Sequence, residues 1–172
     1  LIGGLTGDAL TVGERNTVVG ATALGSDTQG SRAVAIGQSA LATQNFTSAT
    51  DNYNVAVGYG AGQQVTTGVN NTLIGGEAGD AITTASSNVA VGYKSLTTTT
   101  TGANNVAIGV LALEMNTTGT GNTALGREAL EANTTASNNT AVGLKALEAN
   151  TTGTANTAVG KGSLGSNTTA DN

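Results

Sequence analysis

Three glutamates recur at a spacing of seventeen residues and are the first candidates for chemistry in this chain: Glu114, Glu131 and Glu148. Asp8 and Asp80 sit at the same repeat position as these glutamates. Carboxylate oxygens are the ligands that hard cations such as Ca²⁺ prefer, so a column of glutamates is a candidate cation site. The alternative is a solvated corner that nearby basic residues compensate. Those residues are Arg127, Lys145 and Lys161.

The side chains needed for most enzyme chemistry are missing. The 172 residues include no His and no Cys, and no carboxylate pair stands apart from the repeating pattern. There is therefore no candidate nucleophile with its base, and no thiolate metal site. The glycine pairs Gly3-Gly4 and Gly75-Gly76 lack the Lys-Ser/Thr context of a phosphate-binding loop. We expect a non-enzymatic protein that uses no cofactor.

Aromatic residues make up only 2% of the chain, and three of the four gather in one region. Phe46, Tyr53 and Tyr59 lie in or beside the one segment that departs from the regular spacing. Rings that project from a polar surface stack on sugars or dock a partner, so these three residues are the candidate ligand-binding site. The alternative is a tolerated surface loop whose Phe46 packs back on the molecule.

Threonine pairs form a further column, at 66–67, 83–84, 100–101, 117–118, 134–135 and 151–152. A flat threonine array is a candidate ice-binding surface, although adjacent residues of an extended chain point to opposite sides and only one of each pair can contribute. The alternative is turn chemistry with hydrogen bonds between repeats. Asn-x-Thr sequons begin at Asn45, Asn70, Asn116, Asn133, Asn138, Asn150 and Asn167. We interpret them as turn and ladder residues, because neighbouring coils about 4.8 Å apart cannot all carry glycans.

All of these columns follow from one repeat, the pentad Asn-(Thr/Val)-Ala-(Val/Ile)-Gly, which occupies residues 88–92, 105–109 and 139–143, for example. Its closing glycines are seventeen residues apart, except that Gly37 and Gly58 are twenty-one apart. A fixed short period means that each unit is one coil stacked on the last. We predict a single array, residues 1–172, of about ten seventeen-residue coils with a four-residue insertion within 38–54.

The three residues before each glycine are predicted to form a strand, because β-branched residues alternate with alanine there. Both faces of such a strand are small or apolar. One face lines the coil, and we expect the other, probed at Ala124 and Ala141, to be covered by another copy of the chain. The pattern predicts an all-β parallel β-solenoid in which the starting asparagines form a hydrogen-bonded ladder. Good helix propensity at 128–132 and 145–149 leaves open a strand plus one helical turn per coil.

Charge and hydropathy exclude two kinds of partner. The net charge is −5 and only 10% of the residues are charged, whereas phosphate binding needs a basic stripe, so we expect no nucleic acid. No apolar run approaches the roughly twenty residues of a membrane span, so we expect no membrane insertion, and no signal peptide is visible. The chain begins and ends within repeats, from which we expect a longer array.

Residues 34–37, 54–58 and 105–109 resemble the head repeats of YadA-like trimeric autotransporter adhesins and the repeat regions of bacteriophage tail fibres. This resemblance covers the whole chain, although the YadA-like unit is shorter and lacks the Asn-Thr-Thr-Gly turn. It implies a left-handed parallel β-roll, a homotrimer, and a role in attachment to a cell-surface glycan or receptor. The implied location is extracellular, on a cell surface or on a virion.

Together these patterns predict a structural fibre segment, the stalk or head of a tail fibre or surface adhesin. One alternative is a binding module whose ligand, ice included, sits on the insertion or on the threonine column. Another is a solenoid that polymerises into an extracellular filament or sheath.

Overall fold

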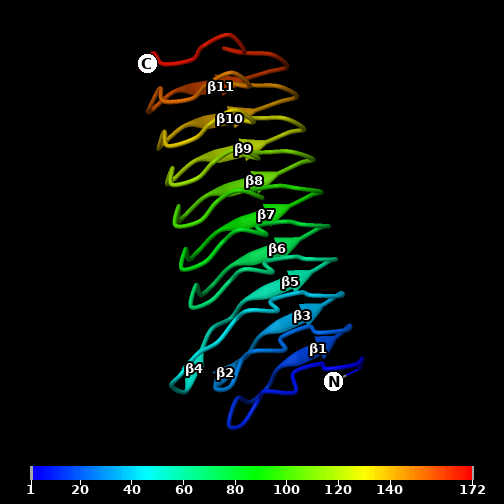
Figure 1. Cartoon of the computed structure of the whole chain (residues 1–172). Helices are drawn as coiled ribbons and strands as arrows, with labels where there is room; N and C mark the ends of the chain where they lie inside the picture. Colours follow the sequence, from blue (N-terminus) through cyan, green and yellow to red (C-terminus); the bar gives the residue numbers. More distant parts are fainter. Residues whose placement is uncertain (1, 172) are drawn as a thin grey trace.

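The computed structural model describes residues 2–171, which form a rod of stacked coils (Figure 1). One parallel sheet of nine three-residue strands runs along the rod. Its strands are β1 (Thr17–Val19), β3 (Val34–Ile36), β5 (Val55–Val57), β6 (Thr72–Ile74), β7 (Val89–Val91), β8 (Val106–Ile108), β9 (Thr123–Leu125), β10 (Thr140–Val142) and β11 (Thr157–Val159). Equivalent residues pair, with Ala124 opposite both Ala107 and Ala141. The predicted all-β parallel β-solenoid with seventeen-residue coils is confirmed.

The longer interval falls between β3 and β5, where Val34 pairs with Val55. The extra residues form a loop whose end pairs with the preceding coil through two short parallel strands, β2 (Gly30–Ser31) and β4 (Thr50–Asp51). This loop projects from the edge of the rod where the other coils make their polar turns (Figure 1). The insertion therefore enlarges one turn and leaves the nine-stranded sheet continuous.

The open alternative of a helical turn is not found, because residues 2–171 contain no helix. Glu128 and Leu130 instead adopt left-handed backbone conformations, with φ of 57° and 53°, whereas an α-helix needs φ near −60°. The amide of Leu130 donates to Ala146 of the next coil at 3.0 Å rather than to its own segment. Left-handed geometry costs about 1–2 kcal/mol for a residue such as leucine, and burying the side chain offsets that cost. Tertiary stacking thus overrides the local helix propensity.

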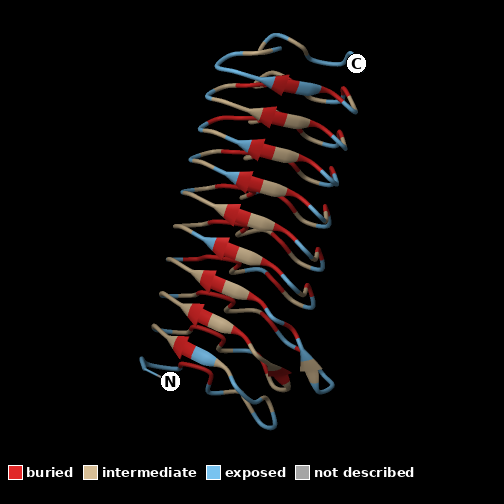
Figure 2. Ribbon diagram, turned by 180° about the vertical axis from the view of Figure 1, so that it is seen from behind, coloured by how far each residue is buried: buried red, intermediate tan, exposed pale blue. Residues whose placement is uncertain are grey.

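The middle residue of each strand points into the coil, and the two outer residues point away from it. Figure 2 shows this pattern as a buried central position flanked by half-buried or exposed ones along the sheet. Ala124 and Ala141 are fully buried within a single chain. The expectation that these alanines mark the uncovered face is therefore wrong. Both strand faces carry small or apolar groups, so alternation alone could not orient the strand. The uncovered face carries the first and third residues.

The interior is filled by strand alanines and by a column of leucines at the corner that follows the strand, such as Leu96, Leu113 and Leu130. In two adjacent coils the positions of the large and the small residue differ from this pattern. Leu73 replaces the strand alanine, and Gly62 and Gly79 stand where other coils have leucine. A Cβ at Gly62 would lie 2.6 Å from Leu73 Cδ1, and one at Gly79 would lie 2.7 Å from Leu73 Cδ2. Leu73, together with the buried Val65 and Ile82 of the same coils, therefore fills the space of the two missing leucines, and the interior stays packed.

The glycine that ends each strand permits the close stacking of the coils. At Gly109 the backbone has φ of 140°, a region that side chains rarely allow. A Cβ there would lie 2.5 Å from the carbonyl oxygen of Gly126 on the next coil. Both the conformation and the close approach require glycine, which explains why the pentad ends in this residue in every coil.

Buried asparagines link the coils, as the pentad predicts, but mainly through the backbone. Asn105 is fully buried; its Nδ2 donates to the Gly119 carbonyl at 2.9 Å, and its Oδ1 accepts from the backbone amide of Asn122 at 2.9 Å. The same pattern repeats at the equivalent asparagines of neighbouring coils. A second column joins side chains directly, with Asn133 Nδ2 donating to Asn116 Oδ1 at 2.9 Å. Backbone groups that would otherwise be unpaired inside the rod are therefore satisfied.

Candidate functional site

The three predicted aromatic residues do not form one site. Phe46 is only 6% exposed, so its ring packs on the rod and is not available for stacking on a ligand. Its backbone amide donates to the buried Asp27 carboxylate at 3.1 Å, and Asp27 also accepts from Gly30 N at 3.0 Å and Gln44 Nε2 at 2.7 Å. The alternative interpretation, in which Phe46 anchors a surface loop, is the one that the geometry supports.

Tyr53 is 52% exposed and lies at the end of the insertion, directly after β4. The Arg32 guanidinium carbon is 5.7 Å from the centre of its ring. Asp51 Oδ2 lies 2.8 Å from Arg32 Nε and 3.5 Å from the Tyr53 hydroxyl. Asp51 raises the pKa of the Arg32 guanidinium by hydrogen bonding and charge, so this arginine stays cationic. A ring, a cation and a carboxylate are therefore held together at one point on the surface.

Tyr59 is 58% exposed but lies beyond the opposite end of β5 from Tyr53. A third exposed tyrosine, Tyr93, occupies the same repeat position two coils further on and is 51% exposed. The sequence prediction did not include Tyr93, because it was limited to aromatic residues in or beside the insertion. The signal was available in the period, since Tyr59 and Tyr93 both follow the closing glycine of a pentad. These two rings belong to the rim of the sheet and not to the insertion.

The outer face of the nine-stranded sheet is uncovered; its third-residue row is aliphatic, and its first-residue row mixes threonine with valine. The third residue of several strands is exposed there, including Ile108 at 37% and Leu125 at 45%. The first residues of the strands are threonine or valine, so neither row on this face carries a charge. The row after the closing glycines adds further exposed apolar residues, among them Tyr59, Tyr93, Val110 and Leu144. Contiguous apolar surface of this kind marks interaction sites in soluble proteins.

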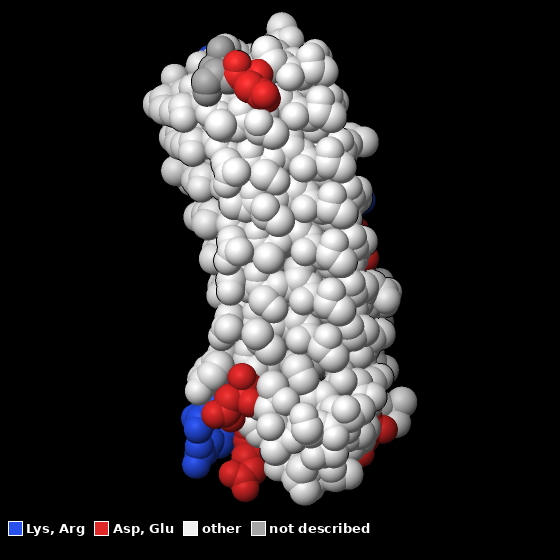
Figure 3. Space-filling model, turned by 90° about the vertical axis from the view of Figure 1, so that its left-hand side faces the viewer, with Lys and Arg blue, Asp and Glu red and all other residues white. Residues whose placement is uncertain are grey.

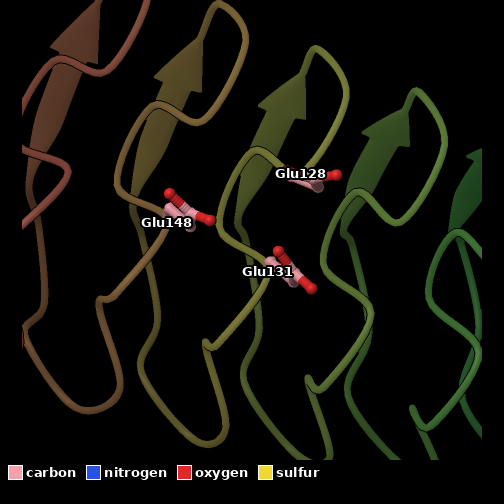
Figure 4. A group of neighbouring side chains, drawn as sticks. All are labelled: Glu128, Glu131 and Glu148. Carbon is pink, nitrogen blue, oxygen red and sulfur yellow. The ribbon is translucent and has the colours of Figure 1, made fainter.

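The carboxylate column differs from the predicted one. Side-chain oxygens of Glu128, Glu131 and Glu148 lie within 4.8 Å of one another, on two adjacent coils (Figure 4). Lys145 Nζ lies 2.9 Å from Glu128 and 2.5 Å from Glu148. An ammonium group thus already supplies the positive charge among these carboxylates, and Arg127 contacts Glu128 at 2.5 Å. The geometry fits the charge-compensated corner better than a cation site.

Glu131 is the member of this group whose charged form is disfavoured in the folded protein. Burial, followed by the charges of Glu128, Glu114 and Glu148, raises its pKa, whereas hydrogen bonds from Lys145 and Arg127 lower the pKa of Glu128. A carboxyl group whose folded-state pKa is raised binds its proton more tightly when folded. The folded state is therefore less stable above that pKa and gains stability as the pH falls through it.

Replacing Glu131 by Gln should raise the melting temperature at neutral pH. The gain in unfolding free energy should be no more than about 1 kcal/mol, because the site is partly exposed. The gain should vanish at about pH 3, where the wild-type carboxyl is protonated. Glu148→Gln is the matched control, since it loses the contact with Lys145 and should give no gain. Calorimetric melts at both pH values check this. A neutral-pH gain that persists in acid would show that charge is not the cause.

The two threonines of each pair have different roles. The first is half-buried and its hydroxyl donates to the carbonyl of its counterpart on the next coil, as from Thr117 to Thr134 at 3.0 Å. The second, such as Thr118, is exposed, and its hydroxyl makes no hydrogen bond within residues 2–171. Figure 3 faces the edge of the rod that carries these turns and shows no charged atoms over its middle coils. One row of free hydroxyls therefore remains, as the alternation of an extended chain predicts.

Several sequons are structural. Asn116, Asn133 and Asn150 are fully buried in the second asparagine column, so they are closed to modification in the folded rod. Asn45, Asn70 and Asn138 are exposed.

Within residues 2–171 no helix is long and apolar enough to cross a membrane. No protein-family model, curated protein or solved structure matches this chain.

Proposed function

We propose that this chain is a non-enzymatic structural segment of an extracellular fibre, in which three copies pack along the rod through the outer face of the nine-stranded sheet. The observation that carries the proposal is the uncovered apolar face, with exposed residues such as Ile108 and Leu125, on an otherwise polar rod. The repeat's resemblance to trimeric adhesin heads and tail fibres favours three chains. The role of such a fibre is attachment, on a phage tail or on a bacterial surface.

The rod suits a mechanical role. Each coil is bound to the next by strand pairing, by turn hydrogen bonds such as Leu113 N to Ala129 O at 3.0 Å, and by the asparagine columns. These bonds continue from each coil to the next, because each repeat of a solenoid stacks on its neighbours, and an unbroken series of them resists bending. Three such rods bound side by side would hold a binding tip at a fixed distance from its anchor.

Replacing both Ile108 and Leu125 by lysine should dissociate the trimer, because each chain would carry two unpaired charges into a desolvated interface at a cost of several kcal/mol. We expect the mass by light scattering to fall threefold while the circular dichroism spectrum is unchanged. Thr118→Lys, on the turn edge, is the control and should leave the mass unchanged. A double-lysine variant with the wild-type mass would show that this face is not the interface.

Ice binding is the second candidate function, and the observation that favours it is the row of free threonine hydroxyls on the uncharged edge. A regular array of hydroxyls at the spacing of strands, about 4.8 Å, is suited to a periodic surface. Thermal hysteresis of the purified rod distinguishes the two functions, since a purely structural fibre segment produces none.

A further inference from the structure

We propose that Arg32, Asp51 and Tyr53 form a glycan-binding site, with a neutral pyranose ring stacked on Tyr53. The inference rests on the proposed attachment function and gives that function a location within this segment. The three residues lie on adjacent coils, where β2 and β4 pair. Nowhere else in residues 2–171 does an exposed ring approach both a guanidinium and a carboxylate.

The site is organised before any ligand binds. Asp51 Oδ2 lies 2.8 Å from Arg32 Nε and 3.5 Å from the Tyr53 hydroxyl, so one carboxylate lies close to both partners. The guanidinium lies 5.7 Å from the ring centre. Tyr53 also sits in a left-handed conformation with φ of 52°, at a repeat position that points outward in every coil. Groups fixed in advance lose little conformational entropy on binding.

The chemistry of these groups matches a sugar. A pyranose has an apolar face, which stacks on an aromatic ring, and a rim of hydroxyls, which needs donors and acceptors. The half-exposed Tyr53 ring supplies the surface for stacking, and the half-exposed Asp51 carboxylate supplies acceptors. The terminal nitrogens of Arg32 supply donors that no described residue uses.

The charge balance favours a neutral sugar over an acidic one. Arg32 is paired with Asp51, and the neighbouring Arg15 is balanced by Glu14 next to it in the sequence. Figure 3 shows both signs of charge mixed at the end of the rod that carries the insertion. No net positive field is therefore available to attract a carboxylate-bearing sugar.

Tyr53→Asn is the decisive variant, because asparagine occupies this left-handed position in other coils, at Asn70, Asn104 and Asn138, and the fold will tolerate it. Asp51→Asn tests the polar partner. Tyr93→Val is the matched control: Tyr93 is equally exposed and lies under a cation, with Lys94 Nζ 5.5 Å from its ring centre, and Val110 fills the same repeat position. The probe is an immobilised array of oligosaccharides with neutral and with acidic terminal sugars.

We expect the wild-type chain to bind at least one neutral glycan, and Tyr53→Asn and Asp51→Asn each to weaken that binding at least tenfold. Tenfold corresponds to about 1.4 kcal/mol, within the range of about 1–3 kcal/mol for stacking on an aromatic ring. Tyr93→Val should change the affinity less than twofold. Wild-type chain that binds no neutral glycan, or Tyr53→Asn with wild-type affinity, would overturn the proposal.

The mass of each sample, measured by light scattering, separates this inference from the proposed function. A trimer that ignores every neutral glycan refutes the sugar site and leaves the fibre intact. A monomer that binds a neutral glycan in a Tyr53-dependent way refutes the trimeric fibre and leaves the sugar site intact.

Discussion

Replacing Leu73 by alanine lowers the free energy of unfolding by about 2–5 kcal/mol, the range for leucine truncation in a packed core. The expected cost lies at the upper end, because Leu73 fills the space next to both Gly62 and Gly79. Alanine is normal at this position in other coils, but there a corner leucine fills the interior. Chemical denaturation of the variant measures the loss.

A leucine at position 62 tests directly whether Leu73 occupies the space that a corner leucine fills in other coils. Gly62→Leu alone should destabilise the rod, since its Cβ would meet Leu73 Cδ1 at 2.6 Å. In the Leu73→Ala background the same change refills the cavity, and the backbone already has φ of 58°, close to that of the corner leucines. We expect the double variant to be more stable than Leu73→Ala alone. Purely additive losses would show that the two positions do not share one space.

Asn105→Leu produces the second large loss. Leucine has a similar size but leaves the buried Asn122 amide without its acceptor, which is now 2.9 Å away. It also removes one of two donors from the Gly119 carbonyl, which keeps Asn116 Nδ2 at 3.1 Å. An unsatisfied buried group costs about 1–3 kcal/mol, so we expect a loss of that size from the Asn122 amide. Hydrogen exchange at the Asn122 amide should also accelerate, because its acceptor is lost.

Asn104→Gly is the matched control for this substitution. Asn104 precedes the ladder residue, is exposed, and has φ of 60°, and the same repeat position holds Gly121 in the next coil. We expect a change of less than about 0.5 kcal/mol, as for most surface substitutions. If Asn105→Leu were no more harmful than this control, the asparagine column would not be what links the coils.

The period of the sequence predicted most of the fold because each coil obeys the same local rules. The strands fall where β-branched residues precede glycine, and the twenty-one-residue gap is an enlarged turn. The inner face could not be predicted, since both faces of a Val-Ala-Ile strand are apolar. Only the structure shows that Ala124 lies inside and that Leu125 lies outside. The sequence also did not predict that Leu73 compensates for Gly62 and Gly79. The period relates equivalent positions of different coils and does not show which different positions share one space.

Of the three residues of the proposed sugar site, the sequence predicted Tyr53 but not Arg32 or Asp51. The insertion did supply an exposed ring, Tyr53, but Phe46 is buried because Asp27 holds its backbone and glycine at position 30 leaves space beside it. Arg32 and Asp51 were not among the predicted residues, because the repeat pattern alone does not bring them into contact. Their contact depends on the register of β2 and β4, which a sequence pattern does not fix.

The mass of the wild-type chain in solution tests the central claim most directly, because the claim is that the sheet's outer face joins three chains. Multi-angle light scattering over a wide range of concentration should give three times the chain mass of 16.6 kDa. That value should persist on dilution, since the aliphatic third-residue row runs the whole length of the sheet. A mass of one chain at the highest concentration, or a mass that grows without limit, would contradict the account.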